Sequence, residues 1–434
     1  MFLYDPRTKK ITETHGGYSD AGLPIRDTFV KFGMDMRCVL YEPVSPTEKS
    51  RIGLICIHSD GDYSTFPIGG ELAKRGYRTL CGQVSDKGAT LDAKMRDVGM
   101  AVEFLRAYPG IEKVLLLGHS GGATLMTAYQ AAAEKGVGVF QTDNMLVKCS
   151  LKEPLPAADG LLSLDANWGN GTMSLISLDP AVVEEGNGMK LDPELDAFDP
   201  ANGFDPEGSA YSEAFLKKFF EAQAARNNAV VKRALERLHA IENGKGFYAD
   251  DEPFSVTGGA QFAPCNKLFP QDIRLVNHTK GKYTLIHPDG SETVEVVHSV
   301  RPARGGRSIT SSIWACEIGT VRSYLTNRGV LAGDNYAITP DGIEGVQWND
   351  VYCCPPGNVR YINVPLLVMG MTGSYEYLAS EAIYNAAVSA DKSIAFVEGA
   401  GHNFDCRGRE AEFGDTQKTV FDYVDKWLSA EGRF

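Results

Sequence analysis

The sequence predicts an α/β fold built on a mostly parallel central sheet. Apolar stretches of strand length alternate with stretches of helical periodicity through the first 150 residues, and the same alternation returns near the C-terminus. One apolar stretch ends in a glycine-flanked serine that is followed at once by a helix, in KVLLLGHSGGATLMTAY (113–129). Because strands that alternate with helices usually pair in parallel, we expect helices to cover both faces of the sheet.

The first part of the chain supplies most of the expected sheet. Its strands end at glycine or polar turns, and its helices end at a glycine or at a Pro-Gly pair. The expected strands lie within 29–43, 51–61, 77–84 and 159–165, the expected helices lie within 69–76 and 91–110, and a strand followed by a helix lies within 113–129.

The alternation is interrupted in the middle of the chain. The interruption contains a long helical run within 212–244, and alternating residues around a Pro-Asp-Gly turn within 282–297 predict a β-hairpin. We therefore expect a core formed by 1–168 and 356–434, with 169–355 inserted after the sixth strand as an α+β cap. In the C-terminal part, the expected strands lie within 364–370 and 392–402 and the expected helices within 380–390 and 416–430.

Composition limits the partners of the chain. Its formal net charge is −13, and such a surface repels nucleic acid and anionic membranes. No apolar stretch reaches the ~20 residues that a helix needs to cross a bilayer, and the first ten residues do not resemble a secretion signal. Nine scattered cysteines without metal-ligand spacing indicate reduced thiols. We expect a cytoplasmic protein with a small-molecule substrate and no metal; its oligomeric state is not indicated by the sequence.

The serine corner is the strongest functional signal. Gly118 and Gly122 flank Ser120 in a G-x-S-x-G pattern, GHSGG, because larger side chains in so tight a turn would meet the strand and the helix. The corner lifts the hydroxyl clear of the sheet. It also places the backbone N–H of Gly121 at a helix N-terminus, where it can stabilise an oxyanion. These features predict that Ser120 is a catalytic nucleophile.

A serine nucleophile needs a base, and His402 is the best placed of the eight histidines. It follows the last apolar strand on a loop of small residues, in EGAGHNF, so its imidazole can reach the carboxyl edge of the sheet. His58 ends an early strand and is expected to shape a loop. His119 is adjacent to the serine but points elsewhere at such a corner, so we expect it to pack beside the site.

The segments IHSDG (57–61), GHSGG (118–122) and GAGH (399–402) resemble the α/β-hydrolase superfamily. The resemblance covers about residues 27–168 and 356–430, and it implies a cap in the insertion. It also implies a Ser-His-acid hydrolase that forms an acyl-enzyme and needs no cofactor, most often with a carboxylic ester or lactone as substrate. Other members cleave amide or carbon–carbon bonds with the same residues or are non-catalytic ligand-binding proteins, and both remain alternatives.

The acid is where the sequence departs from the commonest family pattern, which places a carboxylate shortly after the strand that follows the cap. Gly373 stands at that position, and Glu376 and Glu381 come after it. The other known arrangement places the acid after the preceding strand, where GLLSLDANWG carries Asp165. We expect Asp165 to be the acid, with Glu376 or Glu381 as the alternatives.

The remaining expected site residues lie on loops at the same edge. The backbone N–H of Ser59 or Asp60 is expected to be the second oxyanion donor, in a loop where family members often carry His-Gly. The cap and nearby aromatic side chains are expected to set the substrate's shape. The candidates for the substrate pocket are His119, Tyr63, Phe66, Trp168 and Tyr375.

Overall fold

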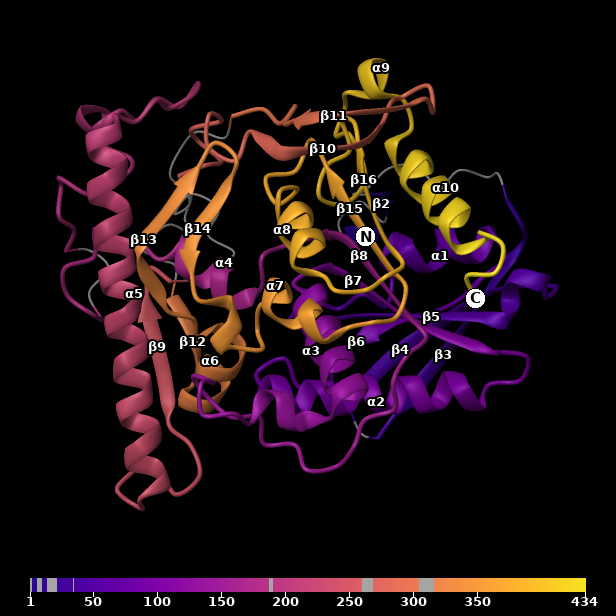
Figure 1. Cartoon of the computed structure of the whole chain (residues 1–434), viewed down its shortest axis with the longest axis horizontal. Helices are drawn as coiled ribbons and strands as arrows, with labels where there is room; N and C mark the ends of the chain where they lie inside the picture. The colour runs from indigo at the N-terminus through magenta and orange to yellow at the C-terminus, as the bar shows by residue number, and fades with distance from the viewer. Residues whose placement is uncertain are drawn as a thin grey trace.

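A ten-stranded sheet forms the centre of the computed structural model, which describes residues 2–5, 10–13, 22–33, 35–186, 190–259, 268–303 and 316–434. The strands lie in the order β11-β10-β16-β15-β8-β7-β5-β6-β4-β3 (Figure 1). Their bounds are β3 Ile25–Phe32, β4 Met36–Pro43, β5 Ile52–His58, β6 Arg78–Gln83, β7 Lys113–Ser120, β8 Gly160–Ala166, β10 His278–Ile286, β11 Glu292–His298, β15 Leu366–Met371 and β16 Lys392–Val397.

Most neighbouring strands of this sheet run parallel. Every pair from β6 through β5, β7, β8, β15 and β16 to β10 is parallel. The pairs β3–β4, β4–β6 and β10–β11 towards the two edges are antiparallel. The prediction of a mostly parallel central sheet is therefore confirmed, and the carboxyl ends of its inner strands meet at one edge.

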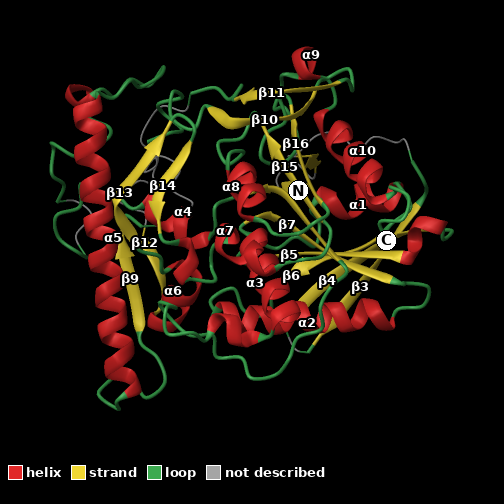
Figure 2. Ribbon diagram, in the orientation of Figure 1, coloured by secondary structure: helices red, strands yellow, loops and turns green. Residues whose placement is uncertain are grey.

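Helices cover both faces of the sheet, as the sequence predicted (Figure 2). Successive side chains of a strand point to opposite faces, and along β7 Val114 and Leu116 join one apolar cluster while Leu115 and Leu117 join the other. The first face packs against α2 (Leu91–Ala107), α3 (Gly122–Lys135) and α8 (Ala379–Ala386), and the second packs against α1 (Pro67–Lys74) and α10 (Thr416–Leu428).

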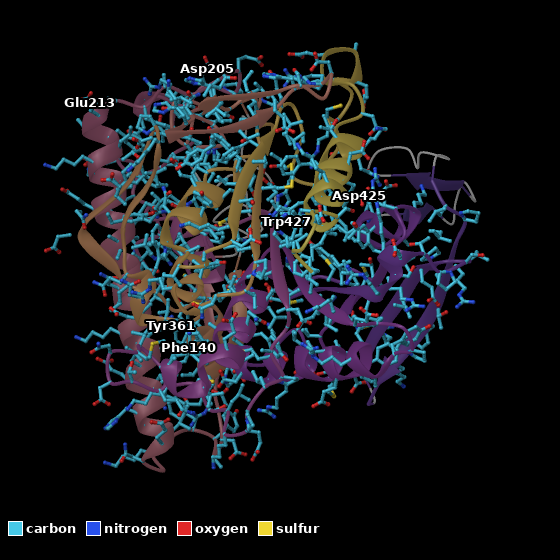
Figure 3. All side chains as sticks on the ribbon, turned by 45° about the vertical axis from the view of Figure 1, so that its right-hand side comes forward. Phe140, Asp205, Glu213, Tyr361, Asp425 and Trp427 are labelled. Carbon is cyan, nitrogen blue, oxygen red and sulfur yellow. The ribbon has the colours of Figure 1, made fainter. Side chains whose placement is uncertain are left out.

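The last helix is tied to the N-terminal half of the core. Asp425 of α10, labelled beside Trp427 in Figure 3, accepts hydrogen bonds from Lys49 Nζ at 2.5 Å and from Tyr77 Oη at 2.7 Å. A short helix, α9 (Glu410–Phe413), precedes α10, and a separate strand pair, β1 (Phe2–Asp5) with β2 (Lys10–Glu13), lies near the N-terminus.

Apart from the strands β10 and β11, most of the segment between β8 and β15 forms a further layer beside the sheet (Figure 1). The predicted long helix is present as α5, whose first residue, Glu213, is labelled in Figure 3. Among the described residues, no helix is both long and apolar enough to cross a membrane. The elements of this layer are α4 (Asn170–Ser177), α5 (Glu213–Glu242), β9 (Pro253–Thr257), β12 (Cys316–Thr320), α6 (Val321–Arg328), β13 (Ala332–Thr339) and β14 (Gly342–Val346). The short helix α7 (Pro355–Asn358) follows them and packs against α3 and α8.

The predicted hairpin is also present, but it belongs to the central sheet. Its strands β10 and β11 pair antiparallel, and β10 pairs in parallel with β16, with Thr284 opposite Ala395. The sequence pattern predicted this hairpin as part of the cap, because it interrupts the alternation of strands and helices. The alternation does not record which neighbour a strand pairs with, so the division into core and cap stays a prediction.

Candidate active site

Ser120 occupies a strained corner between β7 and α3. Its backbone φ is +53°, a left-handed value that non-glycine residues adopt only where the surroundings impose it. A Cβ added at Gly118 would lie 2.5 Å from the Cα of Ala123, so the strand and the helix can approach this closely only with glycine there. The sequence pattern GHSGG therefore folds as the predicted strand, turn and helix, with a partly exposed serine at the corner.

Asp165 lies at the carboxyl end of the neighbouring strand. β7 and β8 are paired in parallel, and Ser120 is opposite Ala166, so the serine and the aspartate lie at the same edge. Asp165 is fully buried and also has a positive φ, +41°. Its Oδ1 accepts a hydrogen bond from the backbone N–H of Met371 at 3.0 Å, which holds the carboxylate in place.

The other carboxylate oxygen of Asp165 meets His402, which lies on the loop after β16. His402 Nδ1 is 2.7 Å from Asp165 Oδ2 and donates to it. In the neutral ring this hydrogen bond leaves Nε2 unprotonated and able to accept a proton. The structure thus brings together two of the residues that the sequence predicted for the site.

The two alternative acids lie in different surroundings. Glu376 is buried, and its Oε2 is 3.6 Å from His402 Nδ1, so its charge acts on the ring at a longer distance than that of Asp165. Glu381 accepts hydrogen bonds from the backbone N–H groups of Lys280 at 3.0 Å and Gly281 at 2.8 Å. Glu381 therefore serves to attach α8 to β10.

The surroundings of His402 favour its protonated form. Burial by itself lowers the pKa of an imidazole. The charge of Glu376 and the hydrogen bond with Asp165 act in the opposite direction, and together they raise the pKa of His402 to about 9.

The loop after β5, which carries Ser59 and Asp60, lies beside Gly121. Ser59 Oγ lies 3.2 Å from the carbonyl oxygen of Gly121. His58 shapes this loop, because its Nδ1 accepts from the backbone N–H groups of Asp60 at 2.9 Å and Gly61 at 2.8 Å. The N–H of Asp60 is thus engaged, so of the two candidates for the second donor we retain Ser59.

His58 remains neutral at this position. Burial lowers the pKa of His58 to about 4, although the charge of Asp60 opposes the shift.

A Cβ added at Gly121 would lie 3.2 Å from His58 Nε2 and 2.8 Å from Asn170 Oδ1. The space beside the Gly121 backbone is therefore too narrow for a side chain.

A chain of hydrogen bonds links Tyr63 to the loop of His402. Nε2 of His119 donates to the carbonyl oxygen of His402 at 2.6 Å, because a carbonyl can only accept. Nδ1 of the neutral ring is then an acceptor, and Tyr63 Oη lies 2.6 Å from it. The ring of His119 is 4.6 Å from that of His402 and 5.0 Å from that of Phe66. His119 therefore contacts His402 directly, and Tyr63 and Phe66 in turn contact His119.

The two other aromatic candidates for the substrate pocket differ in position. Tyr375 lines a cavity of about 140 Å³ together with His402, Arg301 and Arg407. Trp168 is 1% exposed and belongs to the same apolar core as residues of α3 and α4. A bulky aromatic residue near a strand end is compatible with either position, and only the fold distinguishes them.

Chain order and position now agree at one edge of the sheet. A serine lies on a strained strand-to-helix corner, and a buried aspartate lies at the carboxyl end of the neighbouring strand β8. A histidine that is hydrogen-bonded to this aspartate follows β16. The chain has an α/β-hydrolase fold.

Several solved structures are similar to this chain over most of its length, at low sequence identity and with TM-scores below 0.5. The siderophore hydrolase EstB from Aspergillus fumigatus is 12% identical, with a TM-score of 0.44, over 95% of this chain and 99% of that one. Est1E from Butyrivibrio proteoclasticus is 11% identical, with a TM-score of 0.41, over 93% and 97% of the two chains. The α/β hydrolase GrgF from Penicillium sp. sh18 is 10% identical, with a TM-score of 0.42, over 95% and 100%. No protein-family model and no curated protein matches the sequence.

A buried ionic network beside the loop after β5 of this α/β-hydrolase fold was not predicted from the sequence. Lys94 Nζ, on a side chain 1% exposed, lies 3.3 Å from Asp60 Oδ1 and 3.0 Å from Asn327 Oδ1. Arg328 of α6 is 3.8 Å from Asp60 Oδ2 and 2.6 Å from Glu317. Burial alone would raise the pKa of Asp60, but the charges of Arg328 and Lys94 lower it to about 2. The signal was a lysine on the apolar face of a predicted helix, between Leu91 and Val98.

The described residues contain no group of three or more histidine, cysteine, aspartate or glutamate side chains that could hold a metal ion.

Proposed function

We propose that this protein is a serine hydrolase that cleaves a carboxylic ester or lactone of a small to medium organic molecule. Ser120 is the nucleophile, His402 the general base and Asp165 the acid. The observation that carries the proposal is the 2.7 Å hydrogen bond from His402 to the buried Asp165, beside a serine in a strained strand-to-helix corner. Strain of this kind is costly and is concentrated at functional sites.

In the first half of the reaction, Ser120 Oγ attacks the carbonyl carbon of the substrate while His402 Nε2 takes the hydroxyl proton. Asp165 keeps the Nδ1 proton on the ring and stabilises the imidazolium that forms. The backbone N–H groups of Gly121 and Ser59 bind the negatively charged oxygen of the tetrahedral intermediate. The intermediate then collapses, the bond to the alkoxy oxygen breaks, and His402 Nε2 gives its proton to the leaving alcohol.

In the second half, water hydrolyses the acyl-enzyme. His402 removes a proton from water, the hydroxide oxygen attacks the acyl carbon, and a second tetrahedral intermediate forms in the same oxyanion site. Its collapse breaks the ester bond to Ser120, and the serine oxygen recovers the proton from His402. The carboxylic acid product leaves, and no cofactor takes part.

The inserted segment 169–355 acts in this proposal as a cap over the serine edge. Contacts between the insertion and the oxyanion loop support that role, because Asn170 Nδ2 of α4 donates to Ser59 Oγ at 3.0 Å and Arg328 of α6 pairs with Asp60. A cap excludes water and shapes the pocket, so substitutions in it should change KM and substrate preference more than kcat. Cleavage of an amide or a carbon–carbon bond with the same residues is the alternative reaction, and ligand binding without catalysis is the alternative class.

Labelling by a fluorophosphonate, followed by a panel of p-nitrophenyl esters, tests the proposal. The wild-type protein should be labelled on Ser120, and the Ser120→Ala protein should not be labelled. Its kcat should fall by roughly 1,000-fold or more, which is the contribution expected of a serine nucleophile. Ser255→Ala, on an exposed strand residue of the insertion, is the matched control and should keep both. A Ser120→Ala protein that retains a tenth of the wild-type rate would exclude Ser120 as the nucleophile.

A further inference from the structure

The cavity beside His402 has an unusual charge for this chain. Among the residues that the structure describes, its lining includes three arginines, Arg301, Arg407 and Arg409, and one carboxylate, Asp405. The whole chain carries a formal net charge of −13, so the positive charge of three arginines around a cavity of about 140 Å³ is opposite in sign to that of the chain as a whole. Positive charge gathered around a cleft attracts anions and raises their local concentration.

Arg301 is held there without a carboxylate partner. It is 7% exposed, and its Nη1 and Nη2 groups donate to the backbone oxygens of Val276, Phe269 and Leu275 and to Ser299 Oγ. In the part of the chain that the structure describes, its Nε–H has no hydrogen-bond partner and no carboxylate lies within ion-pair distance. Burial lowers the pKa of Arg301 to about 10, although the charges of Tyr377 and Asp272 oppose the shift.

The other two arginines differ in how far they are already engaged. Arg409 is bound by Glu412 through Nε at 3.1 Å and through Nη2 at 2.9 Å, and it donates to the carbonyl of Val300. Arg407 is half exposed, and its Nε lies 3.8 Å from Asp405 Oδ1, beyond hydrogen-bond distance. Arg407 is therefore able to turn towards a ligand at little cost.

We propose that this cavity binds a carboxylate carried by the ester substrate, recognised by Arg301 and Arg407. Arg301 contributes its positive charge, because its Nη groups already donate to backbone oxygens and to Ser299. Arg407 contributes the planar set of donors that matches a carboxylate, and hydrogen bonds between charged groups are the strong ones. Because His402 lines the same cavity, a carboxylate there lies on a substrate whose reacting bond is close to the base. The inference names the substrate class of the proposed hydrolase and rests on that proposed function.

Two pairs of esters that differ only in charge test the inference and locate the carboxylate. On the acyl side, p-nitrophenyl hydrogen adipate is compared with p-nitrophenyl adipamate; on the alcohol side, 3-carboxyphenyl butyrate is compared with 3-carbamoylphenyl butyrate. The wild-type protein should prefer the acid of at least one pair about tenfold or more in kcat/KM, chiefly through KM. Added NaCl at ~0.5 M should reduce the preference, because it screens the exposed Arg407.

Arg407→Gln should lower the preference for the acid about threefold or more, as expected for loss of one partly exposed charge. Arg96→Gln, on an exposed arginine of α2, is the matched control and should leave the preference unchanged. Arg301 is not substituted, because it is hydrogen-bonded to the backbone and Arg407→Gln is sufficient to test the inference. A wild-type preference near one in both pairs, or an Arg407→Gln protein that behaves as Arg96→Gln does, overturns the inference. Hydrolysis of none of the four esters instead overturns the proposed function, and the inference with it.

Discussion

Glu376→Gln should make the protein active at lower pH. The general base must be neutral to take a proton, so kcat/KM rises with pH through the pKa of His402. That pKa is raised to about 9, with the charge of Glu376 the largest contribution in the upward direction. Glutamine keeps the size of the side chain and removes the charge, so the rising limb of the pH profile should move to lower pH.

The size of the shift follows from the geometry. Glu376 Oε2 is 3.6 Å from His402 Nδ1, and both side chains are largely buried. Opposite charges about 4 Å apart interact by about 1 kcal/mol in water and about 4 kcal/mol at an effective dielectric constant of about 20. Since one pKa unit corresponds to about 1.36 kcal/mol, the substitution should lower the pKa of His402 by about one to three units.

The assay is kcat/KM for p-nitrophenyl butyrate from pH 5 to pH 10 on the wild-type and Glu376→Gln proteins. Glu381→Gln is the matched control, because Glu381 is a buried glutamate on the same segment that bonds β10 instead of His402. Its limb should coincide with that of the wild type. A Glu376→Gln profile that superposes on the wild-type profile would refute the reasoning.

The same shift makes stability depend on pH in the folded protein. The pKa of His402 is higher in the folded state than the ordinary histidine value of 6.5. Its contribution to stability is therefore complete below about pH 6.5 and is lost as the pH rises through about 9. Glu376→Gln should reduce this loss, which denaturant unfolding at pH 6 and pH 9.5 measures.

Three further outcomes are expected. Asp165→Asn should cost roughly three to four orders of magnitude in kcat at the optimal pH, while the unfolding transition remains cooperative. Lys94→Met removes one of the cations that pair with the buried Asp60 carboxylate, and it should lower the free energy of unfolding by about 3 kcal/mol. Lys49→Met, at a partly exposed ion pair, is the control and should lower the free energy of unfolding by less than about 1 kcal/mol. Gly118→Ala forces a Cβ against the start of α3 and should destabilise by about 1–3 kcal/mol with loss of activity, whereas Gly138→Ala, with nothing within 4 Å, should change stability by less than about 0.5 kcal/mol.

The sheet and the serine corner were predictable because both depend on local sequence. Each inner strand is a short apolar run, and the runs end where turn residues begin, so the alternation of strands and helices is visible without knowledge of contacts. The corner at Ser120 needs glycine at 118 to let α3 approach β7. That steric requirement is visible in the sequence as the five consecutive residues GHSGG (118–122).

Strand partners and side-chain networks were not predictable in the same way. The hairpin β10–β11 has a clear alternating pattern, yet the pattern does not state that β10 extends the sheet beside β16. Lys94 and Arg328 are separated by more than 200 positions and meet only because α6 packs near α2. The sequence signal was Lys94 on the apolar face of a predicted helix, but it did not identify Asp60 or Arg328 as its neighbours.

The choice between Asp165 and Glu376 as the acid was partly predictable from the sequence and partly dependent on the fold. Each carboxylate follows a strand that ends at the serine edge, so chain position alone left both open, and a carboxylate at a strand end often has only a structural role. The distances differ: Asp165 is within hydrogen-bond distance of His402 Nδ1 at 2.7 Å, and Glu376 is not, at 3.6 Å. A hydrogen bond fixes the tautomer and the orientation of the ring, which a charge at longer range cannot do, while that charge still raises the pKa. Loss of Asp165 should therefore lower the maximal rate, and loss of Glu376 should move the pH at which that rate is reached.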